Sequence, residues 1–303
     1  MTATPSTYAI ETVGLTKRYD GKNAVTDLTL RIPPGEAFGF IGPNGAGKST
    51  TIKMLLGMSR PNAGEARVLG HDAIRDAVAL KQRVGYVPEL HYIYRWMRVG
   101  EVIAFCRPLY ANWNDRFCAD LLKLFELNPE KKVKQLSKGM VAKLALLLAV
   151  AHDPEVLILD EPTSGLDPVV REEFLDGILH TLCERQRTIL FSSHTLSDVQ
   201  RIADTVGLIF EGRLIDHCRT EDLLSATKRV RAVLSDGCSA GPPPEGTIWQ
   251  RAQQREWLMT VRGFSSSTLE FLRAKYSLDS IEVIDLGLED VFKDLIKGRK
   301  AIA

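Results

Sequence analysis

Residues 42–50 read Gly42-Pro43-Asn44-Gly45-Ala46-Gly47-Lys48-Ser49-Thr50, a complete G-x-x-x-x-G-K-[ST] phosphate-binding loop. The loop lies between an apolar segment at 37–41 and a helix-like segment at 50–56, the strand–loop–helix order that the motif requires. Its glycines let successive backbone N–H groups point at phosphate oxygens, and the helix N-terminus adds partial positive charge. We expect Lys48 to reach the β- and γ-phosphates and the Ser49 hydroxyl to bind Mg²⁺, so the chain is predicted to bind a nucleoside triphosphate. The residues expected to contact the nucleotide here are Gly42, Asn44, Gly45, Gly47, Lys48, Ser49 and Thr50.

The composition describes an ordinary globular protein with room for one large domain and a smaller one in its 303 residues. Lys and Arg total 39 and Asp and Glu 38, so no overall charge favours nucleic acid or an anionic membrane as a partner. Five scattered cysteines without a C-x-x-C pair favour reduced thiols in a cytosol. Residues 1–6 lack the features of a signal peptide, and the longest apolar run, 144–151, is too short to cross a bilayer. Any membrane role is therefore expected to come through a partner.

Short apolar segments between helical patterns predict a parallel sheet covered by helices on both faces, because most of them run without polar alternation. The first 35 residues differ, since alternating segments at 10–15 and 28–32 flank a turn at 20–23 and predict an antiparallel hairpin. The predicted buried strands are Ala37–Ile41, Arg83–Val87, Val156–Asp160, Thr188–Ser192 and Val206–Phe210.

A helical signature from about 99 to 151 predicts an inserted helical subdomain, and its aromatic residues predict a small core of its own. These aromatic residues are Phe105, Trp113, Phe117 and Phe125. Two further helices are predicted, one starting at Pro168 with Asp167 as its N-cap, and one starting at a capping box at Ser197.

The composition shifts after about residue 220, where turn-rich segments separate short patterns. We predict a small α+β appendage without a chemical motif. Its expected strands are 230–234, 247–250 and 257–262, and its expected helices are 268–275 and 288–297.

A second group of polar residues ends the apolar segment at 156–160. Asp160 at the tip of a buried strand is the residue type that holds Mg²⁺ in P-loop NTPases. Glu161, next in the chain, is placed to polarise a water for in-line attack on the γ-phosphate. The alternative is that two acidic residues merely end a strand.

Three further runs make a family resemblance specific. They are Leu136-Ser137-Lys138-Gly139-Met140, then Leu159 to Asp167 (LDEPTSGLD), then Ser192-Ser193-His194. With the phosphate loop they resemble, in order over about residues 8–220, the nucleotide-binding subunit of an ATP-binding cassette (ABC) transporter. The resemblance implies a P-loop NTPase fold with an ATP-binding domain at 1–220 and a helical subdomain at about 90–151, and the α+β appendage predicted from the composition is an accessory domain at 221–303.

In that family the signature run of one subunit caps the γ-phosphate of ATP bound to the other. The resemblance therefore implies that Ser137 gives a hydroxyl and Gly139 a backbone N–H to the partner's nucleotide. Lys138 stands where Gly is usual and Met140 where Gln is usual. The lysine either adds a cation at the phosphate or is merely solvated. The LSKGM form is similar to cassettes of exporter-type systems, including antibiotic efflux pumps.

The resemblance also gives expectations for four single residues. Asp167 belongs to a loop that crosses the dimer interface, in addition to capping a helix. His194 is similar to the switch histidine that contacts the γ-phosphate and positions the water. Tyr19 resembles the aromatic residue that stacks on adenine, with packing on the first hairpin as the alternative. Glu89 stands where many members have a Gln that touches the Mg²⁺ shell, and a carboxylate can also bind Mg²⁺.

The aromatic-rich run 90–97 after Glu89 either lines a groove for the membrane partner or packs in the core. The resemblance implies an ATPase that works with ATP and Mg²⁺ as a sandwich dimer, homo- or heteromeric, and powers a separate transmembrane permease. Such a subunit would be cytoplasmic and peripheral on the membrane, with no nucleic acid partner. The alternatives are a soluble ABC-type ATPase of translation or DNA repair, and a low-turnover regulatory module gated by nucleotide.

Overall fold

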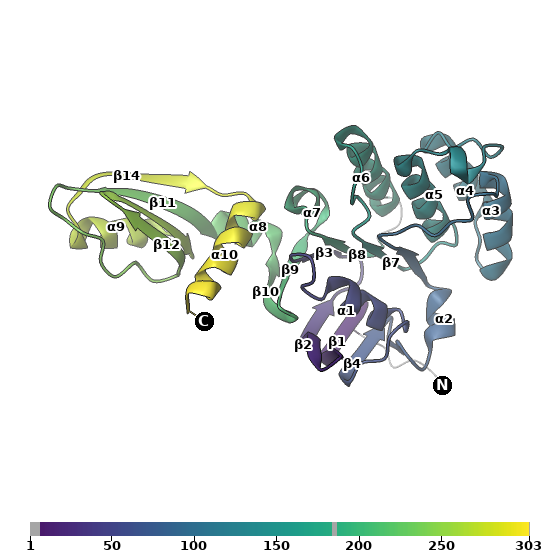
Figure 1. Cartoon of the computed structure of the whole chain (residues 1–303), viewed down its shortest axis with the longest axis horizontal. Coiled ribbons are helices and arrows are strands. Elements are labelled where there is room, and N and C mark those ends of the chain that lie inside the picture. The colour runs from purple at the N-terminus through teal and green to yellow at the C-terminus, as the bar shows by residue number, and fades with distance from the viewer. Residues whose placement is uncertain (1–6, 184–186, 303) are drawn as a thin grey trace. The chain divides into compact units, whose positions relative to one another are not determined.

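The computed structural model describes residues 7–183 and 187–302. It forms two compact units, residues 1–217 and 218–303, which are described separately (Figure 1).

A six-stranded sheet forms the centre of the first unit, in the order β10-β9-β3-β8-β7-β6. Every residue of β3, β7 and β8 is buried, which explains why these strands read as unbroken apolar runs. The pairs β3–β8, β3–β9, β7–β8 and β6–β7 are parallel, as predicted. The strands are β3 Ala37–Ile41, β6 Val84–Val87, β7 Val156–Asp160, β8 Thr188–Ser193, β9 Thr205–Phe210 and β10 Arg213–Arg219.

A second, antiparallel sheet of the first unit has the order β2-β1-β4-β5. The predicted hairpin is confirmed, with Ile10 opposite Ile32 and Tyr19 opposite Lys22. Both strands extend to the turn because Asp20 and Gly21 adopt left-handed φ values of 48° and 79°, which suits a tight two-residue hairpin turn. The strands are β1 Ile10–Tyr19, β2 Lys22–Ile32, β4 Ala63–Val68 and β5 His71–Asp72.

Helices connect these strands, and three of them form the predicted helical region between β6 and β7. Phe117 and Phe125 are buried there as expected. Phe105 is 55% exposed, so its predicted place in the core is wrong. Its ring instead meets the ring of Tyr94 edge to face. The helices are α1 Lys48–Leu55, α2 Ala77–Lys81, α3 Val99–Cys106, α4 Asp115–Leu124, α5 Lys138–Val150, α6 Pro168–Cys183 and α7 Leu196–Ile202, with short 3₁₀ turns at Arg107–Leu109 and Val133–Gln135.

The two predicted helix starts after β7 have different outcomes. Asp167 caps α6 as predicted, because its Oδ1 accepts a hydrogen bond from Val170 N at 3.1 Å. The predicted capping box at Ser197 is wrong, since α7 begins at Leu196 and has no side-chain cap bond. The Asp198 carboxylate is instead buried and accepts hydrogen bonds from the Arg171 guanidinium (Nε–Oδ1 2.7 Å) and from another side chain of the loop after β7.

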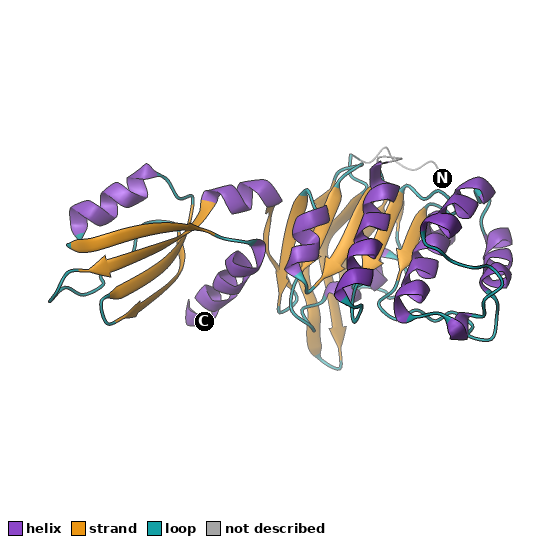
Figure 2. Cartoon of the chain, turned by 90° about the horizontal axis from the view of Figure 1, so that it is seen from above, coloured by secondary structure: helices purple, strands orange, loops and turns teal. Residues whose placement is uncertain are grey.

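The second unit is a four-stranded antiparallel sheet in the order β12-β13-β11-β14, and Figure 2 shows helices beside it. Its core includes Val230, Trp257 and Met259. The three predicted strands and two predicted helices are present, whereas α8 and β14 were not predicted. The elements are α8 Thr220–Ala226, β11 Thr227–Leu234, β12 Thr247–Gln253, β13 Glu256–Arg262, α9 Ser266–Lys275, β14 Leu278–Asp285 and α10 Leu288–Ile302.

Within residues 7–183 and 187–302, no helix combines the length and the apolar character needed to cross a membrane.

Candidate functional site

The loop between β3 and α1 is held in its shape by glycines. Gly45 and Gly47 adopt left-handed φ values of 80° and 111°, a region that side chains disfavour. A Cβ on Gly47 would lie 2.5 Å from the carbonyl oxygen of Ala24, and one on Gly42 would lie 2.4 Å from that of Ile209. The helix α1 begins at Lys48, so its N-terminus opens directly onto the loop. These are the features of an anion-binding loop.

Lys48 is buried and makes three charge-assisted contacts, the longest of them with the Pro43 carbonyl oxygen at 3.4 Å. Its ammonium donates to the carbonyl oxygen of Gly42 at 2.6 Å and forms an ion pair with Glu161 Oε1 at 3.0 Å. The Lys48 and Glu161 side chains are only 5% and 6% exposed, so each charge needs the other. The cation of the loop is thus aimed at the end of β7.

Asp160 ends β7 and receives two hydroxyl groups. Ser49 Oγ donates to Asp160 Oδ1 at 3.1 Å, and Ser192 Oγ donates to the same oxygen at 2.8 Å. The pKa of Asp160 is raised overall, because the effect of burial, helped by the neighbouring Glu161 charge, exceeds the lowering by the Ser192 and Ser49 hydroxyl bonds and the Lys48 charge. Our reading of the sequence missed the part played by Ser192. Its position at the end of the strand beside β7, where it lies opposite Asp160, is the signal that would have revealed it.

Glu161 and His194 form the next layer. The Glu161 backbone adopts a left-handed φ of 48°, and its N–H donates to Ser192 Oγ at 3.1 Å. Its Oε2 lies 2.6 Å from His194 Nδ1 and also accepts a bond from His194 N at 3.2 Å. The His194 side chain is 44% exposed and therefore open to a ligand. The structure thus brings both predicted catalytic residues together.

A cavity of about 230 Å³ opens over these groups. Glu89, on the exposed loop after β6, also lines it. Sequence reasoning did not identify Ala24, which follows the first hairpin turn and reaches the same cavity. The lining residues are Ala24, Asn44, Gly45, Ala46, Gly47, Lys48, Ser49, Thr50, Glu89 and Glu161.

The signature residues are not part of this cavity. Ser137 is exposed and caps α5, because its Oγ accepts a bond from Met140 N at 3.2 Å. Gly139 lies where α5 meets α6, and a Cβ there would lie 2.0 Å from Val170 Cγ1. A single chain therefore leaves Ser137 without a phosphate partner in its own cavity.

Tyr19 and Asp167 also lie outside the residues that line the cavity. The Tyr19 ring is 47% exposed at the end of β1, with the Lys17 ammonium 5.0 Å from its centroid. Its hydroxyl is 3.5 Å from Ser59 Oγ. The Tyr19 ring is free enough to stack on a base, so adenine stacking stays a prediction. Asp167 caps α6, and its place at a dimer interface also stays a prediction.

Among the described residues, no group of three or more His, Cys, Asp or Glu side chains forms a metal site by itself. Ser49 and Asp160 supply a hydroxyl and a carboxylate oxygen, the hard donors that Mg²⁺ prefers. Mg²⁺ commonly completes its octahedral shell with water and phosphate oxygens, so this pair fits it only in company with a nucleotide.

A family model described as ABC transporter matches residues 25–164. The bacitracin transport ATP-binding protein BcrA of Enterococcus faecalis is 32% identical over 302 residues, covering 96% of this chain and 97% of the relative. The Nod factor export ATP-binding protein I of Burkholderia pseudomallei is 40% identical over 204 residues, covering 66% of this chain and 67% of the relative.

A solved ATP-binding subunit of an ABC transporter is similar in structure, with a TM-score of 0.65 and 27% identity. It covers 72% of this chain and 92% of the solved chain. The fold predicted from the sequence is confirmed by this similarity.

Proposed function

Because the chain belongs to the family of ABC transporter ATP-binding proteins, we propose that it hydrolyses ATP with Mg²⁺ to power a separate membrane permease. One observation carries this proposal. A single cavity holds the phosphate loop with Lys48, and the Asp160, Glu161 and His194 side chains converge beside it.

The contacts around Lys48 support a sequence of events on nucleotide binding. Phosphate oxygens would offer the Lys48 ammonium more charge than Glu161 alone, so its contact would shift to the nucleotide. Glu161, released from that ion pair, would accept a proton from the attacking water. His194 would keep the Glu161 carboxylate in place through its 2.6 Å contact.

Ser49 and Asp160 would hold the Mg²⁺, and Glu89 would reach the same cavity from its rim. A bound Mg²⁺ supplies charge stabilisation to the phosphoryl group during transfer. Burial favours a protonated Asp160, and the Ser49 and Ser192 hydroxyls favour its charged form, which is the form that binds a cation. The catalysis proposed is therefore mainly positioning and electrostatics.

The exposed signature supports a dimer in which each ATP contacts two chains. Ser137, at the N-terminus of α5, is exposed and does not line the cavity of its own chain, and it would cover the γ-phosphate of ATP in a second copy or a related subunit. Asp167 would lie in the loop between the two subunits. Tyr19 would stack on the adenine.

An exposed aromatic row supports docking on a permease. Tyr92, Tyr94 and Trp96 are 88%, 58% and 69% exposed, and Phe105 beside them is 55% exposed. A cavity of about 320 Å³ lined by Tyr92, Ile93 and other residues adjoins this row. Clustered exposed apolar side chains mark interaction surfaces. The chain would then lie at the cytoplasmic face of the membrane, and the export named for the Burkholderia relative indicates the direction of transport. Residues 218–303 would form an accessory domain.

The experiment that tests this function replaces the proposed base. Glu161→Gln should keep ATP binding, lower turnover about 10²- to 10⁴-fold, and accumulate an ATP-dependent dimer visible by size-exclusion chromatography. Glu155→Gln is the matched control, because Glu155 lies just before β7 and pairs with Arg83 away from the cavity. Undiminished turnover in Glu161→Gln would contradict the proposal. Steady-state hydrolysis by the unaltered chain with its permease separates it from a low-turnover regulatory module.

A further inference from the structure

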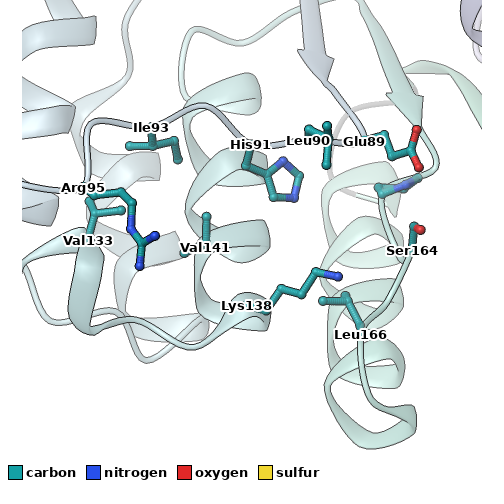
Figure 3. Close-up of a pocket in the computed structure, with 11 residues that line it drawn as sticks. Glu89, Leu90, His91, Ile93, Arg95, Val133, Lys138, Val141, Ser164 and Leu166 are labelled. Carbon is teal, nitrogen blue, oxygen red and sulfur yellow. The ribbon is translucent and has the colours of Figure 1, made fainter.

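Two residues that depart from the usual family motifs, Glu89 and Lys138, line one cavity. The cavity has a volume of about 250 Å³ and lies between the loop after β6, the start of α5 and the loop after β7. In Figure 3 Glu89 and Ser164 lie at one end, Arg95 at the other, and the Lys138 side chain points toward the Ser164 end. The two departures therefore meet in space although 49 positions separate them in the sequence.

The Lys138 ammonium has no carboxylate partner in the part of the chain that the structure describes. Among the residues whose side chains the structure describes, no ion pair within 4.0 Å involves Lys138. Its Nζ lies against the backbone of Gly165, because a Cβ on Gly165 would be 2.2 Å from it. Gly165 lies in the loop that directly follows Glu161, so an unpaired cation is held beside the catalytic segment.

Glu89 is the carboxylate among the described residues that line this cavity, and it also lines the nucleotide cavity. In the nucleotide cavity it would meet the charges of Asp160, Glu161 and the phosphates, which repel it. The other cavity is also lined by Lys138, whose ammonium has no ion-pair partner among the described residues. His91 does not compete for the carboxylate, because burial and the Lys138 charge lower the pKa of His91 and keep it neutral at pH 7.

We propose that Lys138 is a positioning residue for Glu89. The Lys138 ammonium draws the Glu89 carboxylate toward Gly165 and away from the phosphates of the bound nucleotide. The inference rests on the proposed binding of ATP in the loop at 42–50. It explains why a charged pair replaces two neutral residues, since each charge offsets the other.

The test is a double-mutant cycle on ATP affinity, measured in EDTA with the full-length chain dilute enough to be monomeric. Lys138→Met removes the charge and keeps an unbranched side chain of nearly the same length. It should weaken ATP binding about 2- to 5-fold, the scale of an exposed ion pair, because Glu89 then repels the phosphates. Lys138→Arg should retain the ATP affinity. Adding Glu89→Gln to Lys138→Met should restore the ATP affinity that Lys138→Met loses. The coupling should fall between about 0.05 M and about 0.5 M NaCl, because salt screens exposed charges and a purely structural coupling would persist.

Arg95→Met is the matched control, since it removes a cation from the far end of the same cavity. Its effect should add to that of Glu89→Gln without coupling. Additive effects of Lys138→Met and Glu89→Gln at low salt would overturn the inference and leave the proposed function standing. An equally strong coupling between Arg95→Met and Glu89→Gln would do the same. Failure of the unaltered chain to bind ATP would instead overturn the proposed function and the inference with it.

Discussion

The phosphate loop and the signature run sit at the N-termini of two helices, α1 and α5, yet their surroundings are opposite. Lys48 at the start of α1 is 5% exposed and paired with Glu161. Ser137 at the start of α5 is exposed, and the bond described for its Oγ is the one that caps its own helix. We infer from this difference that a single chain completes the phosphate loop at α1, whereas the signature run at α5 would bind a phosphate only in a second chain.

The variant with the strongest predicted effect removes the lysine of the phosphate loop. Lys48→Ala should weaken ATP binding about 100-fold, because charge-assisted contacts to phosphate oxygens contribute about 1.5 to 3 kcal/mol each. Titration with a fluorescent ATP analogue measures the loss.

The control for Lys48→Ala addresses folding. Removing the lysine takes the ion-pair partner from the buried Glu161 Oε1 and leaves only the His194 contacts of Oε2, which destabilises the fold. Lys48→Ala/Glu161→Gln removes that charge and should recover the melting temperature without recovering ATP affinity. Unchanged affinity in either variant would remove Lys48 from the site.

A smaller effect is predicted at the signature run, where Ser137 begins α5. Ser137→Asp keeps a good N-cap for α5 but places a negative charge where a partner's γ-phosphate would lie. Turnover should fall about 10- to 100-fold, while ATP affinity of the monomer stays near its original value because Ser137 is absent from that cavity. Ser137→Asn is the neutral control that also caps the helix.

Mixing sharpens this second prediction. Lys48→Ala and Ser137→Asp should each hydrolyse ATP much more slowly alone than the unaltered chain does. Their mixed dimer joins one intact phosphate loop to one intact signature, so the mixture should regain hydrolysis. An inactive mixture containing a demonstrated mixed dimer would contradict the shared site.

The smallest effect separates packing from function at Gly139. Gly139→Ala should lower the free energy of unfolding by about 1 to 3 kcal/mol, because its Cβ would clash with Val170 Cγ1. Gly139→Ala/Val170→Ala should recover stability in chemical denaturation. If hydrolysis recovers in parallel, Gly139 serves packing alone. If hydrolysis stays low although stability recovers, the absence of a side chain at position 139 is needed for contact with the partner's nucleotide.

Local pattern was sufficient where one kind of interaction determines the structure. The apolar runs at β3 and β7 gave those strands their bounds, because burial on both faces leaves no polar positions. The strand β14 escaped notice since most of its residues are exposed and its pattern is irregular. The helix α8 was not predicted because it is only seven residues long and continues directly into a strand, so it has too few turns to show a helical period.

Long-range contacts explain the remaining errors. Asp198 looks like part of a helix start in the sequence, but Arg171 from α6 binds its carboxylate. Phe105 looks like a core residue, but it lies on the exposed face of α3 beside Tyr94. Ser192 joins the site only because β8 pairs with β7, and single-strand patterns contain no such pairing.

If hydrolysis needs two chains, turnover must depend on protein concentration, which a dilution series measures. Turnover per chain should be measured at saturating ATP while light scattering follows the molar mass. We predict that turnover per chain falls together with the dimer fraction, because a monomer would lack the signature run of a second chain at its nucleotide. Constant turnover per chain through the range where the protein is monomeric would contradict the account.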